Sequence, residues 1–324
     1  MSKKFDNKTL IIVFVILVAI FVYVKFYHSV KTESTLKTEL VKLDTFKITK
    51  ILLYPTAENR EEIQFLKEGN RWKVSKGKIV AEPQNNAVSS LLAQLLEIKP
   101  QSLASRAKDK WAEFRVNDST ATKIKVFEGK KLKLDLYIGK FTYQKGNNMY
   151  AMYGSGGTGT SYVRLAGENE IYAINGFLTF AFNQPFISWR DQALAKINKS
   201  NITSFAFKYP GDSSFSVILQ NKQWIIKGQK ADSAKVADYL GSLSYKNGSS
   251  FDDNFIPSGS PICELTLEGN NMSAVTIQAW IKGNNQYVLN SSINPKSWFT
   301  DNSKTLFSQI FKNSKSFFQQ QKKK

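Results

Sequence analysis

The residues of this chain that could do chemistry are few and scattered. Asp109 and Glu113 are one helical turn apart, a spacing at which two carboxylates can share a site. Paired carboxylates carry out glycoside hydrolysis, but a pair at this spacing lies far more often on a solvated face. A Ser-Lys hydrolase stays open because both residue types are abundant, although no motif marks one.

The histidine and the cysteine restrict the chemistry further. His28 is the only histidine and closely follows an apolar run, so the folded part has no histidine for a Ser-His or Cys-His triad. Cys263 is the only cysteine, and its alternating neighbours predict a small core residue. A single cysteine forms no intramolecular disulfide, and one cysteine with one histidine cannot supply the four ligands of a structural zinc site.

A glycine-rich stretch at residues 154–159, GSGGTG, formally fits the G-x-G-x-x-G pattern. Dinucleotide binding requires such a loop between a strand and a helix. Residues 161–167 alternate as a strand instead, so we interpret the stretch as a hairpin loop. The sequence also has no G-K-[ST] ending that would close a phosphate loop here. We therefore expect no catalytic, cofactor-binding or metal-binding residues, no cofactor and no enzymatic activity.

One apolar run near the N-terminus is expected to determine where the rest of the chain is located. Residues 9–24 are uncharged and contain no Gly or Pro, and aromatic residues extend the run to residue 27 past a single lysine. A helix of about 17 to 20 apolar residues crosses a bilayer core of about 30 Å. No small-residue cleavage site follows, which favours an uncleaved signal anchor held in membrane lipid. Lysines before the run favour a cytoplasmic N-terminus, so we expect a single-pass inner-membrane protein whose bulk is periplasmic.

The charge balance is strongly basic. The 324 residues include 45 Lys and Arg against 26 Asp and Glu, a formal net charge of +19. Such charge is typical of nucleic-acid binding. The lysines are scattered, however, and the only dense block is at residues 322–324, so we expect no nucleic acid partner. Outside the cytoplasm the excess lysine would meet anionic lipid or envelope polymers.

An internal repeat organises the part after the anchor. Residues 46–55 and 200–210 each alternate as a strand and end in Tyr-Pro. A second strand, a polar turn and a third strand with a tryptophan, Trp72 or Trp224, come next in each copy. The pattern predicts two antiparallel meanders, and we expect both tryptophans to be buried in their cores.

Each copy then continues into an amphipathic helix. Pro83 is expected near the first helical position of one helix, and Asp232 is expected to cap the other. Both helices show the i, i+3, i+4 spacing of an apolar face. The expected faces are Val88, Leu91, Leu92, Leu95 and Leu96 in the first copy, and Val236, Tyr239, Leu240 and Leu243 in the second.

The expected fold class is α+β. An N-terminal transmembrane helix would precede two similar units, each an antiparallel β-meander with a covering helix and further strands. The expected segments are a cytoplasmic N-terminus (1–8), a transmembrane anchor (9–27), a stalk (28–45), a first unit (46–199), a second unit (200–312) and an exposed basic tail (313–324). The stalk is interpreted as a helical extension of the anchor. The tail is expected to stay exposed because it has few apolar residues.

Several short segments taken together resemble the DUF4340 family, a bacterial domain of unknown function, in its Bacteroidetes-type form. They are residues 48–51 with Trp72, LLAQLLEIK, WAEFRVND at 111–118, LYIGK at 136–140, SYVRLAG at 161–167, IYAING at 171–176 and SWRD at 188–191. The resemblance covers roughly residues 40 to 300. Arg115 stands where the family pattern has a glycine, so a different turn is expected there.

The resemblance implies no activity and no catalytic residues. Members of this family resemble accessory subunits that accompany an ABC-type transporter linked to gliding motility. We therefore expect a non-enzymatic, membrane-anchored envelope protein with a protein partner. The alternative is a binder of anionic envelope polymer or lipid through its lysine-rich surface. A single basic stripe on that surface would support this alternative. An unrecognised hydrolase is the distant third.

Overall fold

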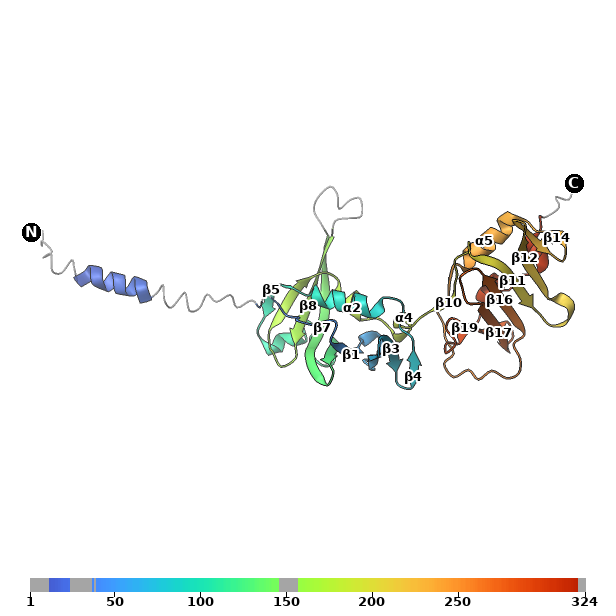
Figure 1. Ribbon diagram of the computed structural model, residues 1–324. Helices are drawn as coiled ribbons and strands as arrows, with labels where there is room; N and C mark the ends of the chain where they lie inside the picture. Colours follow the sequence, from blue (N-terminus) through green and yellow to red (C-terminus); the bar gives the residue numbers. More distant parts are fainter. Residues whose placement is uncertain (1–11, 24–36, 38, 146–156, 320–324) are drawn as a thin grey trace, which may run out of the picture. The chain divides into compact units, whose positions relative to one another are not determined.

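The computed structural model describes residues 12–23, 37, 39–145 and 157–319 (Figure 1). The chain divides by internal contacts into two compact units. Contact unit 1 comprises residues 1–44, 93–123 and 133–179, and contact unit 2 comprises residues 45–92, 124–132 and 180–324. The expectation of an α+β fold is confirmed in its coarse form, because the sheets are mostly antiparallel and the helices are few and short.

The first sheet has nine strands in the order β4-β3-β2-β1-β6-β7-β8-β9-β5. Its strands are β1 (Ile48–Tyr54), β2 (Ile63–Glu68), β3 (Arg71–Lys76), β4 (Ile79–Ala81), β5 (Pro100–Ser105), β6 (Thr122–Glu128), β7 (Lys131–Lys145), β8 (Gly157–Leu165) and β9 (Ile171–Asn175). Alternation fixes the register, because a shift of one residue would turn the apolar set to solvent. Ile51 pairs with Phe65, and both are fully buried.

The second sheet has eight strands in the order β14-β13-β12-β11-β16-β17-β18-β19. They are β11 (Ile202–Lys208), β12 (Phe215–Gln220), β13 (Gln223–Ile226), β14 (Gln229–Lys230), β16 (Cys263–Gly269), β17 (Val275–Gly283), β18 (Gln286–Ser291) and β19 (Phe299–Asp301). A separate two-stranded sheet joins β10 (Ala193–Lys196) to β15 (Tyr245–Asn247).

Both predicted helices form. In α2 (Ala87–Leu96) the expected face is buried except at Leu96, which is 37% exposed. The placement of Pro83 at the helix start was wrong: it forms a bridge with Arg190, and the helix begins four residues later. In α5 (Ser233–Leu243) the whole expected face is buried. Asp232 caps this helix by accepting hydrogen bonds from the Ala234 and Lys235 amides, as predicted.

The two sheets follow the same connection order over eight strands, with the four-stranded meander first and β6–β9 or β16–β19 after it. Each meander is followed in sequence by its helix. The equivalence of residues 46–98 and 200–245 by superposition stays a prediction. The expectation that both tryptophans are deeply buried was wrong, because Trp72 and Trp224 are only half-buried. Trp224 still packs against the core, with its ring 5.8 Å from that of Phe205.

The predicted helical stalk is not found where the structure describes it. Residues 39–44 have no helical structure, and Leu40 and Val41 are buried with 7% and 3% exposure. Lys37 forms an ion pair with Glu168. The end of this segment therefore packs on the folded part. The stalk interpretation placed Leu40 on an extended helix, whereas Leu40 and the adjacent Val41 pack in non-helical chain.

The C-terminal segment also differs from expectation. Helix α6 (Thr305–Ile310) is docked as predicted, with Ile310 buried. The chain then forms η5 (Ser314–Phe317), and Phe317 is 1% exposed in the core of the second sheet. The prediction of an exposed tail from residue 313 was therefore wrong at Phe317, whose buried ring docks the short turn, whereas Asn313, Lys315 and Ser316 are exposed. Residues 320–324 lie outside the described part.

Near the N-terminus, residues 12–23 are helical and their side chains are exposed. None of the helices in the described ranges combines the length and hydropathy of a membrane span. The predicted anchor at residues 9–27 extends beyond the described residues on both sides. Its membrane role stays a prediction.

Candidate functional sites

The residues singled out in the sequence do not come together. Asp109 lies in the turn η2 (Lys108–Trp111), and Glu113 comes shortly after it; both are exposed. The Glu113 carboxylate pairs with Lys110 at 3.0 Å, and this contact lowers its pKa. A surface pair of this kind is solvated. His28 lies outside the described residues.

Where the structure describes them, the glycine-rich stretch and Cys263 both lie on β-strands. Residues 157–159 lie on β8, which pairs antiparallel with β7, so the hairpin-loop interpretation was wrong for them because the strand pairing extends into the glycines. Residues 154–156 are outside the described part. Cys263 is buried on β16 as expected, and burial raises the pKa of its thiol to about 11. Among the described residues, no three His, Cys, Asp or Glu side chains are grouped as metal ligands would be.

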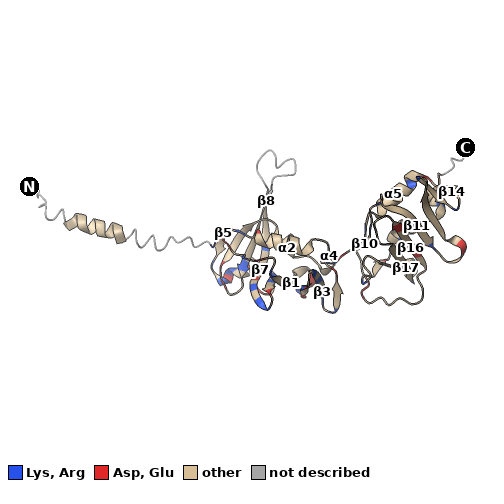
Figure 2. Cartoon of the chain, viewed as in Figure 1, with Lys and Arg blue, Asp and Glu red and all other residues tan. Residues whose placement is uncertain are grey.

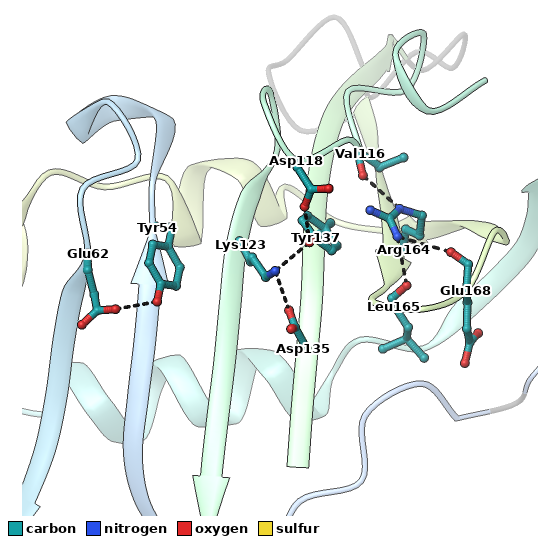
Figure 3. A network of polar contacts seen from close by, with 10 residues as sticks. All are labelled: Tyr54, Glu62, Val116, Asp118, Lys123, Asp135, Tyr137, Arg164, Leu165 and Glu168. Atoms are coloured by element: carbon teal, nitrogen blue, oxygen red, sulfur yellow. Dashed lines mark hydrogen bonds and ion pairs between the residues drawn. The ribbon is translucent and has the colours of Figure 1, made fainter. Parts of the chain in front are cut away.

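A polar network in contact unit 1 centres on the Tyr137 hydroxyl of β7 (Figure 3). Lys123 Nζ donates to this hydroxyl at 2.6 Å, and the hydroxyl donates to the Asp118 carboxylate. Asp135 is 3.5 Å from the same ammonium group. Burial alone would lower the pKa of Lys123, but the hydrogen bond to Tyr137 and the charge of Asp135 raise it above its ordinary value. The lysine is therefore held in its charged form.

Arg164 lies between two aromatic rings beside this network. Its guanidinium carbon is 3.7 Å from the centre of the Trp111 ring and 4.2 Å from that of Tyr137. Arg164 Nε donates to the Val116 carbonyl at 3.0 Å, and Nη1 donates to two further carbonyls, those of Leu165 and Glu168 (Figure 3). Three of its five N–H donors are directed at backbone carbonyls, so this buried cation fastens loops to the sheet.

The loop that Arg164 fastens contains Arg115, the position at which the resemblance led us to expect a glycine. Arg115 has φ 55°, the left-handed region that favours glycine. The backbone thus keeps a conformation that suits glycine although an arginine occupies the position, and the expected different turn is not required. Gly139 lies against this loop: a Cβ there would be 2.2 Å from the Phe114 carbonyl oxygen, so no side chain fits.

A cavity in contact unit 2 has a volume of about 890 Å³. Its lining combines apolar side chains with six charged ones. The charged residues are Glu58, Glu61, Glu62, Lys76, Arg190 and Asp253, and the apolar residues include Ile79, Phe186, Ile187 and Phe251. The excess of carboxylates is notable in a chain of net charge +19. Cavities of this size hold small molecules or peptide side chains.

Lys76 links two of these carboxylates. Its ammonium group pairs with Glu58 and, at 2.9 Å, with Glu61, and these hydrogen bonds raise its pKa. Burial alone would raise the pKa of Glu58, but hydrogen bonds from Lys76 and from the Phe186 amide outweigh it, and the pKa lies below its ordinary value. Glu58 and Lys76 are therefore both ionised near neutral pH. A general acid or base needs a pKa near the working pH, so these groups favour binding over proton transfer.

Arg190 occupies the most buried position of the lining, with 2% exposure. Its Nη1 donates to both carboxylate oxygens of Asp253, at 2.8 and 2.9 Å, and its guanidinium stacks 3.8 Å from the centre of the Phe251 ring. Within the part of the chain that the structure describes, Arg190 Nε has no hydrogen-bond partner. The pair ties the segment after α4 (Phe186–Trp189) to the loop that carries Asp253.

Sequence reasoning did not identify this pair as a site. Residues 188–191 stood out only as part of the resemblance, and nothing near Asp253 distinguished it from the adjacent Asp252. The one local signal is Arg190 itself, a charged residue that directly follows Trp189. Its partner is 63 residues away, and only the folded chain reveals it.

The comparisons with known proteins give one match. A family described as "Domain of unknown function (DUF4340)" matches residues 77–251, more than half of the chain. No curated protein and no solved structure matches.

Proposed function

Since the chain belongs to the DUF4340 family, whose function is unknown, we propose that it is a single-pass membrane-anchored envelope protein that binds partners and catalyses no reaction. The folded part would lie on the periplasmic side of the inner membrane. It would serve as an accessory domain of a complex such as an ABC-type transporter or a gliding-related assembly. Its partners would be lipid and protein rather than nucleic acid.

The helical residues 12–23 carry this proposal. Large apolar side chains here are exposed, with Phe14 at 67% and Phe21 at 65%, and the lysines at positions 3, 4 and 8 precede them. Exposed apolar area of this extent is unfavourable in water and favourable in a bilayer. A membrane is the environment that suits these residues.

The charged cavity supports binding without catalysis. The ion pairs of Lys76 and Arg190 are internal, and the pKa shifts of Glu58 and Lys76 hold both in their charged forms. Two carboxylates of the lining are accessible: Glu61, whose side chain is 64% exposed although it pairs with Lys76, and the exposed Glu62. A partner with a basic segment would complement this lining.

Topology is tested on the full chain expressed in a Gram-negative host. We expect it to remain in membranes washed at high pH, and protease added to spheroplasts to digest the folded part. A variant with Phe14→Asp and Val18→Asp should lose membrane retention, whereas the equally acidic N198D/N221D variant, altered at exposed positions, should not. Extraction of the unaltered chain by alkali, or protection from protease until lysis, would contradict the anchor or the orientation.

The partner is tested by crosslinking in native membranes. A photoreactive residue at Glu61 would report on the cavity, and one at the exposed Lys199 would serve as the control. Crosslinks from position 61 to a membrane transport subunit, absent from position 199, support the proposal. Equal labelling from both positions contradicts a partner at the cavity.

We also propose that the two sheets derive from similar units. The shared strand order supports this, and so does one backbone hydrogen bond. The Gln84 amide, before α2, donates to the Trp189 carbonyl at 2.8 Å, and the Asp232 amide, before α5, donates to the Phe317 carbonyl at 2.8 Å. An experimental structure tests the proposal: residues 46–98 and 200–245 should superpose as meander plus helix. A different strand order in either segment would refute it.

A further inference from the structure

A second groove lies beside α5 in contact unit 2, distinct from the cavity described above. Its volume is about 530 Å³, and its lining comes from α5, the start of β15, α6 and the turn η5. Three lysines line it, Lys235, Lys246 and Lys312, and each is half-buried. Three cationic side chains that converge on one groove differ from the scattered lysines elsewhere. Figure 2 marks the positions of Lys and Arg and of Asp and Glu along the chain.

Each of these ammonium groups has a neutral acceptor. Lys235 Nζ donates to the Phe318 carbonyl at 2.8 Å, Lys246 Nζ to the Gln309 side-chain oxygen at 3.0 Å, and Lys312 Nζ to the Ser308 carbonyl at 2.6 Å. An ammonium group has three donors, so each retains capacity for another acceptor. These contacts hold the lysines at the groove without neutralising them.

Carboxylates do not neutralise the groove. Among the described residues, no Asp or Glu lies within ion-pair distance of these three lysines. Asp238 is the one acidic residue in the lining, and it is exposed. Asp232 uses its carboxylate to cap α5. The lining, with three lysines and one aspartate, therefore has a formal net charge of +2.

The lining side chains and the volume of the groove restrict the class of ligand. Ser242 and Ser316 also line the groove. Both hydroxyls donate within the protein, Ser242 to the Tyr239 carbonyl and Ser316 to the Asn313 side-chain oxygen, so the lysines are the groups that recognise an anion. Lysine binds phosphate as a point charge. A volume of about 530 Å³ exceeds what one inorganic phosphate fills and falls within the range of small-molecule sites.

We infer that the groove formed by Lys235, Lys246 and Lys312 binds a phosphate-bearing ligand larger than a single phosphate. The three ammonium groups neutralise the phosphate oxygens, and the apolar base of the groove at Phe317 excludes water from one side. Membrane anchoring is not required for this inference, so its test can fail while the topology proposal stands, and the reverse.

The test uses the full chain in a neutral detergent. Calorimetric titration with inorganic tripolyphosphate represents a soluble phosphate ligand, and phosphatidylglycerol added to the micelles represents a lipid headgroup, with phosphatidylcholine as its neutral reference. Binding of either anionic probe is expected, and it should weaken as salt is raised. Preference for one probe identifies the source of the phosphate. Absence of binding to both overturns the inference.

The variants assign any binding to the groove. Changing all three lysines to glutamine should weaken binding about tenfold or more, since each charge-assisted contact contributes a few-fold to affinity. A control with Lys196, Lys199 and Lys296 changed to glutamine removes the same charge from exposed positions outside the groove and should change affinity less than about twofold. Equal loss in both triple variants would mean a diffuse charge effect and would overturn the site.

Arginine variants guard against a folding artefact. Changing the three groove lysines to arginine keeps the charge and should retain most of the affinity, and the glutamine variant should unfold at a temperature close to that of the unaltered chain. Loss of binding in the arginine variant with unchanged unfolding would also contradict recognition by charge.

Discussion

After the last strand of each large sheet, an aromatic residue packs into the core of that sheet, and this residue differs between the two sheets. We call it the closing residue and its segment the closing segment. After the first sheet, Trp189 packs edge-on against Phe65 with ring centres 5.4 Å apart. After the second, Phe317 packs among Phe205, Tyr239 and other rings at 5.3 to 6.2 Å. Each closing residue gives its carbonyl to the amide that precedes the adjacent helix. The backbone contact is thus shared, while the side chain that fills the core is not.

The two closing segments differ in the residues that come immediately after Trp189 and Phe317. Trp189 is followed by the buried Arg190 and its ion pair with Asp253, and the chain continues to β10. Phe317 is followed by Phe318, whose carbonyl accepts from Lys235. The first closing segment therefore adds a buried charge, and the second adds further aromatic packing. The same backbone hydrogen bond is compatible with both closing segments, because the side chains that follow Trp189 and Phe317 lie in different surroundings.

The largest effect is expected at the second closing segment. Phe317→Ala removes a fully buried ring and should lower the free energy of unfolding by about 3 to 5 kcal/mol, measured by chemical denaturation. Trp189→Ala should cost a similar amount if the two segments close their sheets alike. The half-buried Phe318→Ala is the matched control and should cost less. A cost below about 1 kcal/mol for Phe317→Ala would show that the second sheet closes without it.

The buried ion pair is the next test. Asp253→Ala leaves the Arg190 guanidinium buried without its partner and should destabilise the fold by about 3 kcal/mol. The adjacent Asp252 pairs with Lys282 near the surface, so Asp252→Ala should cost about 0 to 1 kcal/mol. Equal costs for the two neighbours would show that Arg190 adds no buried charge to the first closing segment.

The two tryptophans give a smaller contrast between the sheets. Trp224 packs against Phe205 and the second core, so Trp224→Ala should cost about 2 kcal/mol. Trp72 is half-buried on β3, and Trp72→Ala should cost about 1 kcal/mol. These values are below the cost of truncating a fully buried ring. A larger cost at Trp72 than at Trp224 would reverse the comparison.

The smallest effect concerns pH at the cavity. The pKa of Glu58 is lowered in the folded chain, so its contribution to stability is present above the unfolded pKa and is lost as pH falls through the folded pKa. Lys76→Gln removes the main favourable contact and should reduce stability at pH 7 by about 1 kcal/mol, with a smaller reduction at acid pH. Denaturation of both forms across this pH range checks the expectation. A difference that grows toward low pH would contradict it.

Local pattern determined most of the elements. The predicted strands of the two meanders became β1 to β3 and β11 to β13, the alternating segment that begins at residue 161 became the second half of β8, and both amphipathic segments became helices. These outcomes arise from periodicity, which a short window of sequence contains. The Asp232 cap was equally local, because its partners are two and three residues away. The short strands β10, β15 and β19 carry too few residues for a period to show.

The tertiary structure decided which residues meet over long sequence distances. The burial of Leu40, Val41 and Phe317 and the pairing of Arg190 with Asp253 depend on surfaces that other segments supply. The same holds for the groove lysines, which come from α5, β15 and the segment after α6. A sequence window states the propensity and charge of each residue. Burial and pairing are decided by the groups that the fold places opposite that residue, and the sequence alone does not state this.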